Sequence, residues 1–338
     1  MTLDDAARER LEHFIARAAG ARQVNISRIE RMSGGAVQQN CAVDAELTGG
    51  AHGGLQRWVL RIDAPAKVAE SLTRSEEFRV LQVMQQANVL APRPLWLCED
   101  SAVLGRPFFI MERVPGVAAG HKVARDARVV PDRARLAREL AETLARIHTV
   151  RPPQAGLGFL KTTRARDNIA HYRAYLDTLA ESYPVLEWGL RWCETHAPVY
   201  EDVTFIHRDY RTGNYLVDNG TLTGVLDWEF AGFGNPLEDV GWMFAKCWRF
   251  GQHQYPVGGV ANAEDFLRPY EAASGRKIDA AALTYWQVMA HLRWAVIALQ
   301  QRERHRSAIE PSLELALTGH IVSDLELEVL TLTREESQ

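Results

Sequence analysis

The chain has 338 residues, of which 46% are hydrophobic and 24% are charged, a composition typical of globular proteins. The formal net charge of −4 argues against nucleic-acid binding, and no run of about 18 apolar residues could cross a membrane. The four cysteines are too few and too irregularly spaced for a disulfide framework or a zinc motif, so a cytoplasmic location is expected.

The first predicted element is an amphipathic helix, with no apolar signal-peptide core, that ends at Gly20. Two strands follow at residues 24–30 and 39–47, separated by a stretch that contains Ser33, Gly34 and Gly35. Two glycines between strands can let backbone amides approach phosphate groups. They also suit an ordinary hairpin turn, and both interpretations stay open at this point.

The next strand, Trp58–Ile62, alternates so that Val59 and Arg61 share one face. The only lysine before residue 122 is Lys67, which lies beyond this strand. A helix is predicted over residues 71–87, and two glutamates near its start, Glu76 and Glu77, are available as partners for Arg61.

Two more strands, at residues 94–99 and 108–112, complete a five-stranded antiparallel sheet. An apolar strand that stops at Pro115-Gly116 predicts a turn there. Helices are then predicted over 131–150, 166–181 and 185–196.

The densest group of polar residues follows a short apolar strand, Val203–Ile206. Its members are His207, Asp209, Arg211 and Asn214. Two further strands, 215–218 and 221–226, flank Asn219-Gly220, a strong signal for a type I′ hairpin turn.

This hairpin would bring two oxygen-bearing side chains together. If residues 219 and 220 form the turn, Asp227 becomes a diagonal neighbour of Asn214, with α-carbons roughly 7–8 Å apart. Carboxylate and amide oxygens are the ligands that Mg²⁺ prefers. A metal held by such a pair beside a free carboxylate, Asp209, is typical of phosphoryl transfer, in which the free Asp orients the attacking hydroxyl and accepts its proton.

The remainder of the chain is predicted to be helical to its end, with segments centred on 240–249, 263–274, 280–303 and 312–331. Three residues of the third segment are candidates to line a pocket: His291, Arg293 and Trp294.

The sequence HRDYRTGN, followed by VLDWE, resembles the catalytic segment of the aminoglycoside phosphotransferase and choline kinase-like family, whose members phosphorylate small molecules. The resemblance implies that Asp209 is the catalytic base and that Asn214 and Asp227 are metal ligands. His207 would support the loop, and Arg211 is a candidate to contact the transferred phosphate. The segment from Gly234 to Asp239 resembles the family's G-x-P-x-x-D motif, in which the Asp braces the catalytic loop. Most relatives have Gly at the position of Arg208.

The same resemblance gives roles to residues of the amino-terminal part. The family usually has a lysine on the third strand to hold the nucleotide phosphates, and Arg61 occupies that position here. Leu60-Arg61 matches the acyl-CoA-dehydrogenase-linked branch of the family. Glu77 is the favoured partner of Arg61, because Glu-Phe-Arg-Val-Leu resembles the family's Glu-Tyr-Arg-Val-Leu. The stretch Ser33-Gly34-Gly35 would approach the phosphates. The backbone groups of Glu112 and Val114 would contact the purine.

The sequence therefore predicts an α+β, two-lobed, protein-kinase-like fold, with a small antiparallel lobe over residues 1–112 that binds nucleotide and a mainly helical lobe over 113–338 that holds the catalytic loop. The predicted function is transfer of the γ-phosphoryl of ATP or GTP, with Mg²⁺, to a hydroxyl of an unidentified small molecule. Two alternatives stay open: a nucleotide-binding protein with little turnover, because Arg61 replaces the usual lysine, and a metal-dependent hydrolase that uses His207, Asp209 and Asp227. No nucleic-acid or membrane partner is predicted, and the sequence does not indicate an oligomeric state.

Overall fold

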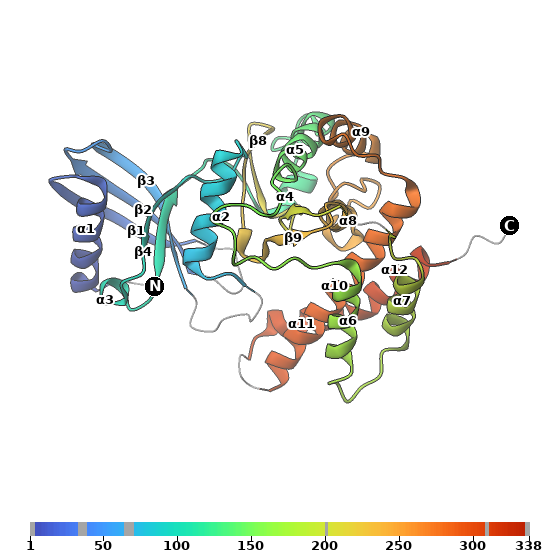
Figure 1. The fold of residues 1–338 in the computed structure, drawn as a ribbon. Coiled ribbons are helices and arrows are strands. Elements are labelled where there is room, and N and C mark those ends of the chain that lie inside the picture. The colour runs from blue at the N-terminus through green and yellow to red at the C-terminus, as the bar shows by residue number, and fades with distance from the viewer. Residues whose placement is uncertain (1–3, 33–38, 64–70, 200–201, 308–310, 335–338) are drawn as a thin grey trace. The chain divides into compact units, whose positions relative to one another are not determined.

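Five strands of the described N-terminal residues form one antiparallel sheet (Figure 1). Their order across the sheet is β1-β2-β3-β5-β4. Their bounds are Gln23–Arg31 for β1, Gln39–Thr48 for β2, Gly54–Ile62 for β3, Pro94–Cys98 for β4 and Phe108–Glu112 for β5. The number and direction of the strands agree with the sequence-based prediction. The sequence did not predict that β5 would insert between β3 and β4.

Alternation along β3 sends side chains to two different helices. Helix α1, Asp5–Ala19, contributes Leu11 and Ile15 to a core that also contains Trp58, Leu60 and Ile62 of β3. On the other face of the sheet lies α2, Arg74–Gln86, whose Phe78 ring meets Phe109 of β5 edge to face at 5.8 Å. Arg61 shares the α2 face, as the period of two predicts.

Capping fixes where both helices begin and end. The Asp4 carboxylate accepts the amide of Ala7, and α1 ends at Gly20, whose φ of 64° favours glycine. Thr73 and Glu76 form a reciprocal capping box at the start of α2. A short helix that the sequence did not predict, α3 at Ser101–Leu104, precedes β5.

The structure is a computed structural model that describes residues 4–32, 39–63, 71–199, 202–307 and 311–334. It divides into two compact units. The first comprises residues 1–116, 153–159 and 223–231, and the second comprises residues 117–152, 160–222 and 232–338. The first unit thus extends four residues beyond the predicted lobe end at 112. It also includes two later segments, one of which contains Asp227.

The second unit contains short strands and most of the helices. Strand β6, Thr204–Ile206, pairs antiparallel with β9, Gly232–Gly234. Strand β7, Tyr215–Asp218, pairs with β8, Thr221–Val225, whose residues 223–225 are assigned to the first unit. Asn219 and Gly220 both have positive φ, 48° and 76°, as the predicted type I′ turn requires. The helices are α4 Gly120–Arg125, α5 Arg133–Ile147, α6 Ala165–Leu176, α7 Pro184–Thr195, α8 Leu237–Phe244, α9 Ala263–Ser274, α10 Ala280–Arg306, α11 Leu313–His320 and α12 Val322–Leu332. Two 3₁₀ turns, η1 at Trp228–Phe230 in the first unit and η2 at Lys246–Trp248, complete the elements.

Helix α10 forms the centre of the second unit, where it packs against α6, α7, α8 and α12 around one apolar core. The predicted helix over 312–331 is interrupted at Ile321, where α11 ends and α12 begins. The prediction of helix throughout the region after Asp239 is wrong for residues 249–262, which are irregular.

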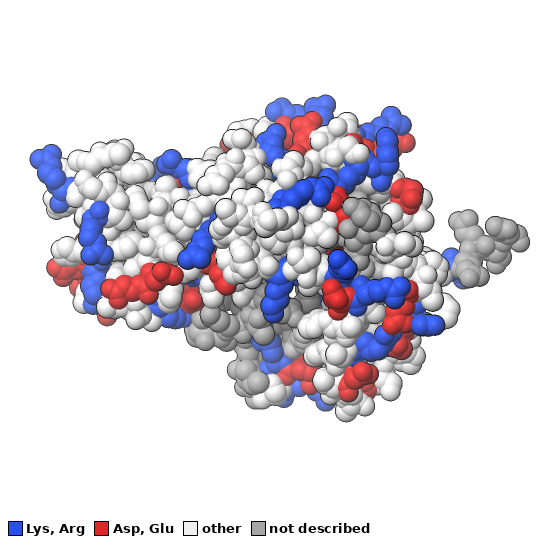
Figure 2. Space-filling model, in the orientation of Figure 1, with Lys and Arg blue, Asp and Glu red and all other residues white. Residues whose placement is uncertain are grey.

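Charged side chains of both signs are interspersed over the face shown in Figure 2, without one large region of either sign. Among the helices of the described residues, none is long and apolar enough to cross a membrane.

Candidate active site

The loop after β6 is held by its own histidine. His207 is fully buried, its amide donates to Asp239 at 2.7 Å, and its Nδ1 accepts the amide of Asp209 at 3.1 Å. The strand itself is anchored because the Phe205 amide donates to the Val150 carbonyl at 2.7 Å. His207 thus fixes the backbone from which the Asp209 side chain extends. The Nδ1 atom of His207 is occupied by the hydrogen bond from the Asp209 amide.

Asp239, near the start of α8, receives three hydrogen bonds in a fully buried position. Its carboxylate accepts the amides of His207 and Arg208, both at 2.7 Å, and the Nε2 of His148 at 3.1 Å. Burial alone would raise the pKa of Asp239. The hydrogen bond and charge of His148 and the interactions with His207 more than offset burial, so this pKa lies below its ordinary value of 3.8. The carboxylate is therefore ionised at neutral pH and ties the loop after β6 to α8.

We expect Asp239→Asn to lower the free energy of unfolding by at least about 2 kcal/mol, because the amide group introduces donors where donors already converge. The folded-state pKa of Asp239 is depressed, so its stabilising contribution is present above pH 3.8 and lost as the pH falls through the lower folded value. The difference between wild type and variant should therefore shrink in acid. Urea denaturation at several pH values measures both effects.

Asp177→Asn provides an exposed carboxylate control at the end of α6. A free energy of unfolding for Asp239→Asn within about 0.5 kcal/mol of wild type would contradict the assigned role, since surface substitutions typically lie in that range.

The Asp209 carboxylate is oriented by three donors. Its Oδ1 accepts Trp242 Nε1 at 2.8 Å and Arg211 Nε at 3.0 Å, and its Oδ2 accepts the Asn214 amide group. The same Asn214 nitrogen donates to the Asp209 carbonyl at 3.0 Å. The contact of Trp242 was not predicted from the sequence. The signal was its position three residues after Asp239 on the same helix, where side chains share a face.

Two arginines beside Asp209 have different environments. The Arg211 guanidinium lies over the Trp248 ring at 4.4 Å, so this side chain is held against the protein surface. Arg208 has a left-handed φ of 65°, a conformation that favours glycine and explains why Gly suits this position. The Arg208 carbonyl accepts Arg293 Nη1, and its Nε lies 3.7 Å from Glu238.

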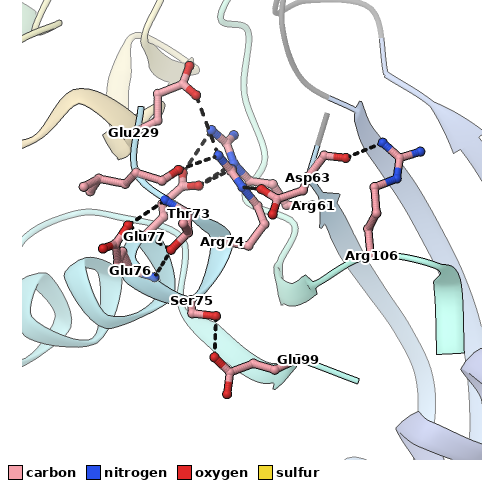
Figure 3. Close-up of polar contacts among 11 residues, drawn as sticks. Arg61, Asp63, Thr73, Arg74, Ser75, Glu76, Glu77, Glu99, Arg106 and Glu229 are labelled. Carbon is pink, nitrogen blue, oxygen red and sulfur yellow. Dashed lines mark hydrogen bonds and ion pairs between the residues drawn. The ribbon is translucent and has the colours of Figure 1, made fainter. Parts of the chain in front are cut away.

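In the first unit, Arg61 of β3 makes a two-pronged ion pair with Glu77 of α2 (Figure 3). Both N–O distances are 3.0 Å, and both side chains are almost fully buried. Arg61 Nη1 also donates to Asp227 at 3.1 Å. Burial alone would lower the pKa of Arg61, but the charges of Glu77, Asp227 and Glu229 raise it above its ordinary value. Arg61 therefore remains charged.

The structure also shows why Glu77, and not Glu76, pairs with Arg61. The Glu76 carboxylate accepts the amide and hydroxyl of Thr73, both at 2.8 Å, as part of the capping box. That role uses Glu76 to begin the helix, and Glu77 one position later turns toward β3. The sequence predicted this pairing.

Asp227 lies in a left-handed conformation, with φ 59° and ψ 60°, immediately before the 3₁₀ turn η1. Its side chain is 32% exposed. Trp228 is buried and donates to the Val225 carbonyl at 3.0 Å, and the Leu72 amide donates to the Glu229 carbonyl at 2.8 Å. Burial, partly opposed by the charge of Arg61, raises the pKa of Glu229 to about 7. These contacts fix the segment while part of the Asp227 carboxylate stays accessible.

The structure says little about several residues that were predicted to contact the nucleotide. The Glu112 amide donates to the Arg93 carbonyl at 2.9 Å, which leaves the carbonyl of Glu112 as its backbone group for a purine. Val114 lies two residues beyond β5 in the first unit. Residues Ser33, Gly34 and Gly35, and also Lys67, lie outside the described residues. The roles of all these residues stay predictions.

The two predicted magnesium ligands have suitable donor atoms. Because the Asn214 nitrogen is directed at Asp209, its Oδ1 is the atom left for a cation, and Asp227 offers a partly exposed carboxylate. Asn214 belongs to the second unit and Asp227 to the first, so their sharing of one ion stays a prediction. Within the described ranges, no group of three or more His, Cys, Asp and Glu side chains is arranged to hold a metal.

A shallow hollow of about 470 Å³ lies along α11, lined by Trp294, Leu313, Glu314, Leu317, Thr318 and Ile321. Trp294 therefore lines a pocket, as predicted. His291 does not, because it is buried, with Nδ1 donating to the Gln287 carbonyl at 2.7 Å and Nε2 accepting the Lys246 amide at 3.3 Å. Burial lowers the pKa of His291 to about 4, so it is neutral at pH 7. The Arg293 guanidinium packs over the Trp242 ring at 4.6 Å and donates to the Arg208 carbonyl in the loop after β6.

Comparison with known proteins decides the family. Residues 28–286 match the profile of the phosphotransferase enzyme family, which covers more than half of the chain. The chain belongs to the phosphotransferase enzyme family. The sequence-based resemblance to aminoglycoside phosphotransferases is thereby confirmed.

Solved structures show that this phosphotransferase-family chain has the kinase-like fold. A crystal structure of a putative aminoglycoside phosphotransferase from Ralstonia eutropha JMP134 superposes with a TM-score of 0.76 at 21% identity, covering 96% of this chain and 97% of that one. The GDP complex of aminoglycoside 2′-phosphotransferase-IIIa gives a TM-score of 0.62 at 16% identity, with coverages of 96% and 99%. Spectinomycin phosphotransferase, in complex with ADP and spectinomycin, gives 0.62 at 10% identity, with coverages of 96% and 98%.

Curated relatives of this phosphotransferase-family chain are larger proteins. Acyl-CoA dehydrogenase family member 10 of Mus musculus is 30% identical over 212 residues, which is 57% of this chain and 19% of the relative. Family member 11 of Rattus norvegicus is 23% identical over 304 residues, or 83% of this chain and 38% of the relative. The chain thus spans less than two fifths of either relative's length.

Proposed function

We propose that this protein transfers the γ-phosphoryl group of ATP or GTP, in the presence of Mg²⁺, to a hydroxyl group of a small molecule. The observation that carries this proposal is the Asp209 carboxylate, which extends from a buried strand end and is oriented by Asn214, Trp242 and Arg211. A fixed carboxylate of this kind suits the alignment of an attacking hydroxyl and the acceptance of its proton.

The second support is the cluster around Arg61 in the first unit. Its guanidinium is charged, is held by Glu77 and carries a third contact to Asp227, so one of its nitrogens can exchange Asp227 for a phosphate oxygen. Similar structures contain GDP in one case and ADP with an antibiotic in another, which supports a nucleotide as the phosphoryl donor.

Each proposed residue has a distinct role in this reaction. Asn214 and Asp227 would each offer an oxygen to Mg²⁺, and the cation would supply neutralisation of charge on the nucleotide phosphates. Arg61 holds phosphate oxygens, Asp209 orients the acceptor hydroxyl and takes its proton, and Arg211 contacts the transferred group. His207 and Asp239 keep the loop in place, as their hydrogen bonds to its backbone require.

The test combines binding and transfer. We expect ATP or GTP to raise the melting temperature of the protein only when Mg²⁺ is present, and we expect labelled phosphate to appear on at least one alcohol in a broad metabolite panel. Nucleotide stabilisation without transfer to any alcohol would favour the alternative of a binding protein with little turnover. Absence of any Mg²⁺-dependent stabilisation by either nucleotide would refute the proposal.

A further inference from the structure

Arg74, the first residue of α2, is buried, which is rare for an arginine. Its side chain is only 3% exposed, although arginine is almost never fully buried unless it is paired. The guanidinium contacts three carboxylates from three segments: Asp63 after β3, with Nε 3.1 Å from Oδ1; Glu77 on its own helix; and Glu229, with Nη2 3.7 Å from Oε2. Its Nη2 also donates to the Leu72 carbonyl at 3.3 Å.

Glu77 therefore lies between two guanidinium groups, as Figure 3 shows. Its Oε2 accepts Arg61 Nε at 3.0 Å and also accepts Arg74 Nη1. A carboxylate held from two sides keeps its orientation when one partner changes its contacts. Glu77 can thus continue to hold Arg61 while Arg61 exchanges Asp227 for another anion.

The balance of charge gives Arg74 a second effect. The cluster contains two arginines and four carboxylates, namely Asp63, Glu77, Asp227 and Glu229. Interactions between charges are strong where water is excluded. Without Arg74, Arg61 would be the only cation that the described residues place against Glu77 and Asp227, and a phosphate would compete with both carboxylates for it.

We propose that Arg74 is a positioning residue for nucleotide binding: by holding Glu77, and by placing a positive charge 3.7 Å from Glu229, it leaves Arg61 able to bind the phosphates of the nucleotide. This inference rests on the proposed function, in which one cation, Arg61, holds the nucleotide phosphates. It adds Arg74 as a second arginine that keeps Arg61 in position. Arg74 acts through Arg61 and Glu77 and does not itself contact the nucleotide.

The experiment measures the dissociation constant of Mg·ATP, or of Mg·GTP if that binds more tightly, by calorimetry. Arg74→Met should weaken binding by about tenfold or more, comparable to the loss of other supporting partners around metal sites. Arg74→Lys restores the charge without the fork and should recover part of the affinity. The matched control is Arg106→Met, because Arg106 donates to the Asp63 carbonyl at 2.7 Å but has no contact with Glu77 in Figure 3. Its affinity should stay within about twofold of wild type.

A purely structural role for Arg74 makes a different prediction. It would lower the melting temperature of the free protein and leave the dissociation constant unchanged. If Arg74 acts through Arg61, the double variant Arg61→Met/Arg74→Met should bind no more weakly than Arg61→Met alone, since the effects of coupled residues are not additive.

The outcomes separate the two proposals. If the wild-type protein binds neither Mg·ATP nor Mg·GTP, the proposed function fails and the role of Arg74 fails with it. If wild type binds and Arg74→Met binds with equal affinity, only the role of Arg74 is overturned. Should Arg74→Met not fold, Arg74→Gln, which also removes the charge, takes its place, and an unchanged dissociation constant for that variant overturns the role of Arg74.

Discussion

Replacing Asp209 with Asn is expected to lower kcat by about 10²–10⁴-fold, the usual contribution of a general base. The substitution keeps the size of the side chain and an oxygen that can still accept the indole hydrogen of Trp242, but it removes the charge that takes up the proton. The affinity for Mg·nucleotide should change little, because neither task of Asp209 involves the nucleotide in the ground state. This is the pattern of an interaction made in the transition state.

Turnover of an acceptor from the metabolite panel measures this effect, or slow hydrolysis of ATP by water if the panel gives none. Asp218→Asn, at the far end of β7, serves as a control in the same region of the chain. Turnover by Asp209→Asn within about twofold of wild type, far below the range for a general base, would show that the assigned mechanism is wrong.

Replacing Asp227 with Ala is expected to abolish the Mg²⁺-dependent part of the stabilisation by nucleotide. A ligand at 100 times its dissociation constant stabilises a protein by about 2.7 kcal/mol, and the variant should lose this gain because the cation loses its carboxylate. The free protein should remain folded, since Arg61 keeps both contacts with Glu77.

Melting temperatures with ATP, in the presence and absence of Mg²⁺, test this prediction. Glu46→Gln removes an exposed carboxylate from β2 in the same unit and should retain the full Mg²⁺ dependence. If Asp227→Ala retained it too, the assignment of Asp227 as a metal ligand would have to be withdrawn.

Features determined by local chemistry could be predicted from the sequence. Asn219-Gly220 gave the correct turn because only a few residue types tolerate positive φ at both positions. The face of Arg61 followed from the period of two along β3, and α1 ended at the predicted glycine. Each of these features depends on a few neighbouring residues.

Features that depend on distant segments could not be predicted in this way. Strand β9 has only three residues, two of them glycine, and forms because β6 lies beside it. Arg74 meets Asp63 and Glu229, which are separated by 166 positions in the chain, and neither residue indicates a partner by its local pattern. The contact of Trp242 with Asp209 likewise depends on how α8 packs against the loop.

The candidate site likewise contains residues that could be predicted from the sequence and residues that could not. The motif residues were identified by their spacing, and their roles as base, metal ligands and supports are predictions still to be tested. The residues that orient them, Trp242 and Arg74, appeared only when the fold brought separate segments together.

The pairing of Arg61 and Arg74 around one glutamate has a consequence for the evolution of this sequence. A lysine at position 61 has no fork with which to hold Glu77 and Asp227 together, so Arg61→Lys alone would leave part of the cluster without a partner. The arginine at 61 and the arginine at 74 are therefore expected to be inherited as a pair. If position 61 of β3 changes between lysine and arginine during evolution, we expect position 74 at the start of α2 to change as well.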